Sequence, residues 1–149
     1  MSDDVDILAS YWTLAVGSEP HTDHEYSSVP FRERVAAAAR AGFKGFGIWH
    51  ADLEHTLKTL SLREMKQILD DNGMKHVELE FLTFWFVDDE RRKQSDALRQ
   101  FLLNAAAELG ARTLKVGDFF RTPVTMPRLI DEFGQLCKEA ERHGVRIGY

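Results

Sequence analysis

Five short segments rich in hydrophobic residues predict five β-strands, and in the second, third and fourth of them apolar residues alternate with small or polar ones. These segments are residues 7–12, 45–49, 77–81, 113–117 and 145–149. In the third of them, Val77, Leu79 and Phe81 alternate with two glutamates, Glu78 and Glu80. Because successive side chains of a strand point to opposite faces of a sheet, this strand has one apolar and one charged face.

Four longer segments between these strands carry hydrophobic residues at helical spacing, and they begin near Pro30, Ser61, Glu90 and Thr125. The pair Ser61 and Glu64 has the spacing of a helix capping box. Glycine ends a helix at little steric cost because it adopts the left-handed conformation readily. Each of the four helices ends in a glycine, a hydrophobic residue and a cation: Gly42-Phe43-Lys44, Gly73-Met74-Lys75, Gly110-Ala111-Arg112 and Gly144-Val145-Arg146. The chain is therefore a repeat of helix and strand, which predicts a parallel sheet.

The faces of the predicted strands favour a barrel over an open sheet. Central strands of a doubly wound sheet are apolar on both faces, because helices cover both. Residues 77–81 and 113–117 each have one face that is small or charged, which suits the inside of a barrel near its mouth. We therefore expect an α/β protein, an incomplete parallel (β/α) barrel of TIM type with about four βα units and a fifth strand. A flavodoxin-like sheet fits the length, but no glycine-rich phosphate loop follows the first strand.

The length and the last residues predict the domain organisation. A (β/α)8 barrel typically has about 250 residues, whereas the chain has 149. The fourth glycine triplet is followed by only Ile147-Gly148-Tyr149, so the chain stops inside its fifth strand. We expect residues 1–149 to form one domain, the N-terminal half of such a barrel.

Composition excludes some partners and locations. The net charge of −5 and the absence of a basic stripe argue against nucleic acid as a partner. No apolar run is long enough to cross a bilayer, and the acidic N-terminus lacks the features of a signal peptide. The single cysteine, Cys137, excludes a disulfide scaffold. We expect a cytoplasmic protein without a membrane partner.

The strongest candidate for chemistry is Glu80, at the C-terminal end of the third strand. A carboxylate on the charged face can act as an acid or base, and burial could raise its pKa toward a useful range. The alternative is an ion pair with Lys115 on the neighbouring strand, and both can hold because an unpaired buried charge is costly. Lys115 is itself a candidate for binding a substrate oxygen or phosphate.

Aromatic residues lie around the same predicted mouth. Trp49 has a flat apolar ring that can stack on a sugar, and its alternative role is to fill the barrel. Trp12 can line a carbohydrate pocket, cover an open barrel edge or form a subunit contact. The nearby residues His21, Asp23, His24 and Glu25 are of metal-ligating types. We interpret them as a solvated loop over the mouth, because a zinc site needs fixed tetrahedral geometry.

Four segments carry a resemblance to a known family: residues 41–50, 77–81, 107–112 and 143–149. Taken together, they resemble the xylose isomerase-like TIM barrels, the sugar phosphate isomerase/epimerase superfamily. The resemblance runs over nearly the whole chain, and the first segment is the most specific. Within that superfamily, the stretch at residues 49–53 is similar to a bacterial branch that includes C-glycoside deglycosidase catalytic subunits.

The resemblance implies a divalent metal, Mn²⁺, Mg²⁺, Co²⁺ or Zn²⁺, at the C-terminal mouth. In the family its carboxylate and histidine ligands come from the later strands, and the first is a glutamate at the end of strand five. The chain stops at Tyr149, immediately before that position. We therefore assign no metal ligand here and expect this polypeptide to bind none. By the same resemblance His50 contacts the sugar, the alternative being an exposed loop histidine.

The leading hypothesis from the sequence is half of a metal-dependent sugar isomerase or epimerase that abstracts a proton next to a carbonyl. Glu80 and His50 would contribute acid–base chemistry, and Trp12, Trp49 and Lys115 would contact a sugar or glycoside. A second hypothesis is a non-catalytic half-barrel that dimerises or completes a barrel with a partner chain, because its outer strands leave open edges. An endonuclease on damaged DNA, also found in the superfamily, is disfavoured by the net charge.

Overall fold

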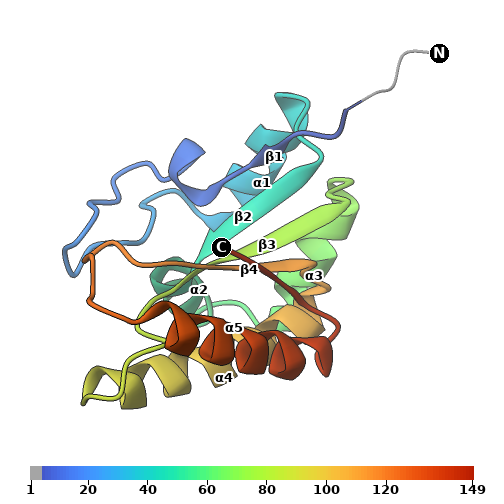
Figure 1. The fold of residues 1–149 in the computed structure, drawn as a ribbon. Coiled ribbons are helices and arrows are strands. Elements are labelled where there is room, and N and C mark those ends of the chain that lie inside the picture. Colours follow the sequence, from blue (N-terminus) through green and yellow to red (C-terminus); the bar gives the residue numbers. More distant parts are fainter. Residues whose placement is uncertain (1–4) are drawn as a thin grey trace.

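The computed structural model describes residues 5–149 as a five-stranded parallel sheet with helices packed against it (Figure 1). The strands follow one another across the sheet in chain order, from β1 to β5. A flavodoxin-like sheet would change direction at a switch point, so this order rules that alternative out and confirms the barrel-type α/β fold. The strands are β1 (Leu8–Ala9), β2 (Gly45–Trp49), β3 (His76–Leu82), β4 (Thr113–Val116) and β5 (Arg146–Gly148).

The helices occupy the connections between the strands. A short 3-10 helix, η1, precedes α1, and two helices, α2 and α3, join β2 to β3. Their bounds are η1 (Tyr11–Thr13), α1 (Phe31–Arg40), α2 (His50–Thr56), α3 (Leu62–Asp71), α4 (Arg91–Leu109) and α5 (Met126–Glu141). Each of the four predicted terminating glycines has a positive φ, between 66° and 92°. The predicted capping box of α3 is present, with both of its hydrogen bonds.

Two predictions about the first half of the chain were wrong in detail. The first strand is only Leu8–Ala9, because the chain turns into η1 after Ser10. A helix, α2, begins at His50, where an open loop was expected. This helix follows β2 with no intervening residue, so no turn signal in the sequence announces it.

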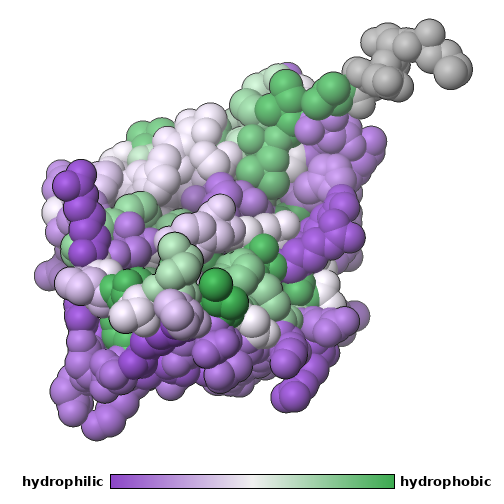
Figure 2. Space-filling model, viewed as in Figure 1, coloured by the Kyte–Doolittle hydropathy of each residue, from purple (hydrophilic) through white to green (hydrophobic). Residues whose placement is uncertain are grey.

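The apolar faces of the strands meet the helices in one core. Phe46, Ile48, Leu79 and Leu114 are at most 1% exposed and belong to this core together with the buried faces of α3 and α4. The opposite face of the sheet carries Glu78, Glu80 and Lys115, as the alternation predicted. Phe81 was expected on the apolar face, but it stacks with Trp49, and Leu82 lies in the core instead, because the register of β3 shifts between Leu79 and Leu82. Figure 2 shows this face with hydrophilic and hydrophobic residues side by side, above the strongly hydrophilic outer surface of α4 and α5. No helix among the described residues is long and apolar enough to cross a membrane.

A buried ion pair fastens the elements that follow β1 and β2. The guanidinium of Arg34 on α1 lies 2.7 Å from the carboxylate of Asp52 on α2, and both side chains are at most 3% exposed. The same carboxylate accepts a hydrogen bond from the backbone N–H of Ser27 at 2.9 Å. The hydroxyl of Tyr11 lies 3.5 Å away. The pair therefore ties α1, α2, η1 and the long connection before α1 to one point.

We predict that Asp52→Asn destabilises the protein by about 3–5 kcal/mol, because it leaves Arg34 with an uncompensated buried charge. Urea unfolding measures this free energy. The matched control is Asp70→Asn, which breaks the solvent-exposed pair between Lys66 and Asp70 on α3 and should cost under about 1 kcal/mol. Equal losses in the two variants would contradict a structural role for the buried pair.

Candidate functional site

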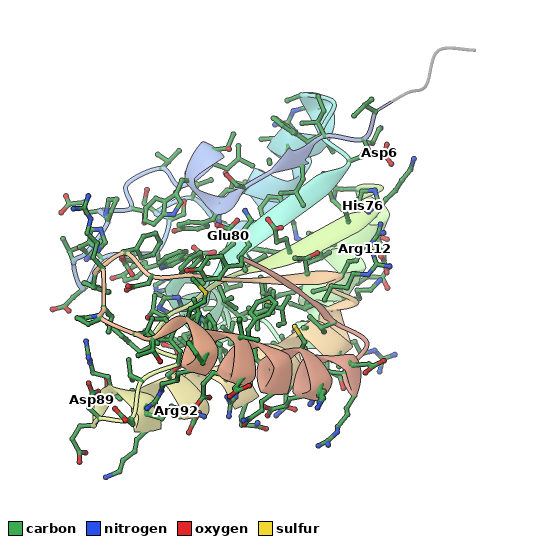
Figure 3. All side chains as sticks on the ribbon, viewed as in Figure 1. Asp6, His76, Glu80, Asp89, Arg92 and Arg112 are labelled. Carbon is green, nitrogen blue, oxygen red and sulfur yellow. The ribbon has the colours of Figure 1, made fainter. Side chains whose placement is uncertain are left out.

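The candidate site is built on the open face of the sheet, at the C-terminal ends of β2, β3 and β4. Trp49 of β2 pairs in register with Glu80 of β3, and Lys115 of β4 lies beside them. Figure 3 shows Glu80 near the middle of the sheet, with Asp6 and His76 towards the other end of the strands. The parallel strands bring these side chains to one face because alternate residues share a face.

Glu80 is held by two neighbours. One of its oxygens accepts a hydrogen bond from the backbone N–H of Tyr11 at 3.2 Å and lies 3.5 Å from the Lys115 ammonium. The side chain is only 5% exposed. Burial raises the pKa of Glu80 above its ordinary value, although the positive charge of Lys115 acts in the opposite direction. A carboxyl group of this kind is closer to exchanging protons at neutral pH than an exposed glutamate.

Lys115 is shared between two glutamates. Its ammonium lies 2.7 Å from Glu78, closer than it lies to Glu80. Burial acts to lower the pKa of Lys115, but the hydrogen bond to Glu78 and the charge of Glu80 outweigh it, and the pKa is raised. The ion pair expected between Lys115 and Glu80 is thus present, and Glu78 joins it. Because Lys115 is about one-third exposed, it is the charged member of the trio that a ligand reaches most easily.

The space that Glu80 occupies exists because residue 47 is a glycine. A Cβ atom added at Gly47 would lie 2.5 Å from the nearer Glu80 oxygen and 2.9 Å from the backbone nitrogen of Tyr11. Both distances are too short for a side chain at this position. Gly47 therefore belongs to the site as the residue that admits Glu80, a role that sequence reasoning missed.

Aromatic rings surround the charged trio. Trp49 is 6% exposed, and its ring centroid lies 5.3 Å from that of Trp12 and 6.1 Å from that of Phe81. Phe81 in turn stacks on Phe119 at 4.5 Å. Trp12 and Phe119 are more exposed, at 39% and 55%. The structure thus brings Trp12 and Trp49 together, and the row continues across the ends of β3 and β4.

His50 lies at the first position of α2, next to Trp49, with their ring centroids 4.8 Å apart. Burial lowers the pKa of His50 below its ordinary value, although the charges of Glu25 and Glu54 act to raise it. His50 is therefore neutral at pH 7, and a neutral imidazole can accept a proton. It contacts the aromatic part of the site, while Glu80 and Lys115 form the charged part.

The carboxylate of Glu25 completes the site from the connection before α1, and no sequence pattern indicated its contact with Trp49. Its Oε2 accepts a hydrogen bond from the indole N–H of Trp49 at 3.0 Å. Its Oε1 accepts one from the backbone N–H of His21 at 2.8 Å. The interpretation of residues 21–25 as a loop over the mouth fits these contacts. Among residues 5–149, no three His, Cys, Asp or Glu side chains are grouped to hold a metal ion.

A parallel sheet in chain order, with charged groups and aromatics at the C-terminal strand ends, defines a TIM-type α/β barrel protein. Residues 35–149 match the family model of the xylose isomerase-like TIM barrel, and the chain belongs to this family. The search of curated proteins returned no match. The placement near C-glycoside deglycosidase subunits stays a prediction.

Solved structures share the fold. A fusion protein of a xylose isomerase-like TIM barrel and 4-hydroxyphenylpyruvate dioxygenase is similar with a TM-score of 0.70 and 24% identity, over 82% of this chain and 20% of that one. The IolI protein with a bound zinc atom has a TM-score of 0.68 and 19% identity, over 83% and 46% of the two chains. D-psicose 3-epimerase from Clostridium cellulolyticum H10, solved with D-tagatose, has values of 0.62 and 19%, over 80% and 46%. The chain therefore spans less than half of each relative.

We predict that Gly47→Ala destabilises the protein by about 1–3 kcal/mol, because the added methyl group displaces Glu80 or the strand beside it. The matched control is Gly134→Ala in α5, where an added Cβ has no neighbour within 4 Å. That change should stabilise the helix by about 0.5–1 kcal/mol. Urea unfolding measures the change in the free energy of unfolding for both variants. An increase in Gly47→Ala would contradict the close approach of Glu80.

A second prediction concerns pH. Because the pKa of His50 is lower in the folded state than its ordinary value of 6.5, the unfolded chain binds more protons below that pH. The stability contributed by neutral His50 is thus present above about pH 6.5 and is lost as the pH falls, by at most about 1.4 kcal/mol per pH unit. The free energy of unfolding of His50→Gln, measured between pH 7.5 and 5, should depend less on pH than that of the unmodified protein. His143→Gln controls for removing a histidine, and identical curves for His50→Gln and the unmodified protein would refute the assignment.

Proposed function

We propose that this chain is the N-terminal half of a sugar or sugar phosphate isomerase or epimerase that abstracts a proton next to a carbonyl. The observation that carries the proposal is Glu80, a buried carboxyl with a raised pKa at the C-terminal end of a barrel strand. In TIM barrels this end of the strands is where catalytic residues lie. A carboxyl tuned by burial is suited to general acid–base catalysis near neutral pH.

The surrounding side chains have distinct roles in this proposal. Glu80 acts as acid or base, and neutral His50 supports proton transfer or contacts the sugar. Lys115 donates to a substrate oxygen, for which its raised pKa keeps it charged. Trp12 and Trp49 provide apolar ring surface for the C–H face of a sugar. Among relatives of the same fold, a D-psicose 3-epimerase solved with D-tagatose supports a ketose as the substrate class.

A divalent metal is implied by the family and by the zinc atom bound to the relative IolI. The described residues do not fit such a site, because they contain no cluster of ligating side chains. We propose that the ligands belong to the complementary part of the barrel. The roles proposed for the residues of this chain do not depend on contact with the metal.

Open surfaces support the assignment as half of a barrel. Within residues 5–149, β1 pairs only with β2 and β5 pairs only with β4, which leaves two free parallel edges. Beside β5 an apolar groove of about 470 Å³ is lined by Trp85, Leu129, Ile130, Phe133, Gly134 and Tyr149. Further βα units would cover both features. A non-catalytic half-barrel that dimerises or joins a partner chain would cover them as well, and the intact mass in the source cell, 17.1 kDa or well above it, tells these possibilities apart.

The test is solvent deuterium incorporation. We expect the polypeptide that carries these residues in its source cell to exchange the proton next to the carbonyl of a ketose such as D-tagatose for deuterium, as followed by proton NMR. Removing divalent metal with a chelator should stop the exchange. Glu80→Gln should lower the exchange rate by about 10²–10⁴-fold, the usual contribution of a general acid or base.

The matched control is Glu108→Gln on the exposed face of α4, which should leave the rate unchanged. If Glu80→Gln keeps the full rate, Glu80 is not the acid or base. If no ketose, aldose or sugar phosphate exchanges a proton with metal present, the proposed reaction is wrong.

A further inference from the structure

The connection between η1 and α1, residues 14–30, is long and has no regular secondary structure. Loops of this length in compact domains are usually functional. Three bonds attach this loop to the rest of the protein through Glu25 and its neighbours. The hydroxyl of Tyr11 donates to the backbone oxygen of Glu25 at 3.1 Å, the indole of Trp49 donates to its carboxylate, and the backbone N–H of Ser27 donates to Asp52.

Both carboxylate oxygens of Glu25 are engaged, one by the Trp49 indole and the other by the backbone N–H of His21. The carboxylate therefore links the ring to the loop with two hydrogen bonds to a charged group, which are stronger than those to a neutral acceptor. The indole N–H is the only polar atom of a tryptophan side chain. Once Glu25 accepts from it, the rest of the ring is an apolar surface.

Trp49 lies beside the buried carboxylate of Glu80. It pairs in register with Glu80 on the same face of the sheet, and the rings of Trp12, Phe81 and His50 surround it. Both Trp49 and Glu80 are at most 6% exposed. A tryptophan that is free to turn away would admit water to the charged face beside it.

We propose that Glu25 is a positioning residue, which fixes the Trp49 ring beside Glu80 and so helps to keep the Glu80 carboxylate out of water. This proposal rests on the proposed function only in taking Glu80 as the catalytic carboxyl group. The role of Glu25 itself follows from the hydrogen bonds and burial described above, and it can be tested without substrate or metal.

The experiment is exchange of the Trp49 indole proton with D₂O, followed by nitrogen–proton NMR, with the resonance assigned by Trp49→Phe. In the unmodified protein and in Glu25→Gln, which keeps an acceptor oxygen, exchange should be slow. In Glu25→Ala it should be at least tenfold faster. The matched control is Glu19→Ala in the same loop, whose side chain is exposed and which should leave the rate unchanged.

A second readout is the titration of Glu80 by carbon NMR. The groups around it are Lys115, Glu78 and the backbone N–H of Tyr11. In Glu25→Ala the pKa of Glu80 should fall towards its ordinary value, because water reaches the carboxylate, whereas Glu25→Gln should keep it raised. If the pKa of Glu80 falls in both Glu25→Ala and Glu25→Gln, the loop as a whole covers the site, and the proposal is wrong.

An unchanged indole exchange rate in folded Glu25→Ala, or equal acceleration by Glu19→Ala, would also overturn the proposal. If Glu25→Ala does not fold, Trp49→Phe removes the donor and keeps an aromatic ring. Exchange of the His21 amide, which is bound to the other Glu25 oxygen, should then become faster, and an unchanged rate would overturn the proposal. Absence of sugar turnover would refute the proposed function and would leave these readouts unaffected.

Discussion

The arrangement of the mouth depends on the buried ion pair between Arg34 and Asp52. Burying two charges is costly, and the cost is recovered only when the geometry is good and the remaining donors and acceptors are satisfied. Asp52 meets this condition because it accepts from Arg34 and from the backbone of Ser27, and the Tyr11 hydroxyl lies 3.5 Å from it. Since the backbone of Tyr11 also donates to Glu80, the pair on the helix side of the sheet fixes the residue that holds the carboxylate on its open side.

On the open face, burial and charge act against each other. Glu78 and Glu80 on one strand would repel each other, and Lys115 stabilises both by lying between them. Burial still raises the pKa of Glu80, so the pairing lessens the cost of desolvation without removing it. A ligand oxygen that drew Lys115 away would weaken the attraction between Lys115 and Glu80. The pKa of Glu80 would then rise further, and Glu80 would accept a proton more readily. In the proposed function, Lys115 would therefore couple substrate binding to proton transfer.

Local patterns in the sequence were sufficient for the repeat of helix and strand, the capping box of α3 and the alternation that places Glu80 opposite the core. Each of these depends on residues a few positions apart, and the pairing of Lys115 with Glu80 follows once the strands are placed side by side. The Arg34–Asp52 pair and the contact between Glu25 and Trp49 could not be predicted, because they join residues 18 and 24 positions apart. The helix α2 could not be predicted because it follows β2 with no intervening residue. Gly47 could have been predicted, because a glycine inside a strand often marks a site that another group approaches closely.

The open edges connect the fold to the proposed half-barrel. A charged face is tolerable on a sheet only where it meets water, a ligand or a matching set of charges. In this chain the Glu80 side chain is already only 5% exposed, although the sheet is not closed, because it lies against the backbone of Tyr11, against Gly47 and against Lys115. These five strands therefore form this polar site from their own residues. In the proposed full barrel, further βα units would supply the metal ligands and cover the apolar groove beside α5, while the carboxylate, its lysine and the neighbouring aromatic rings are already in place.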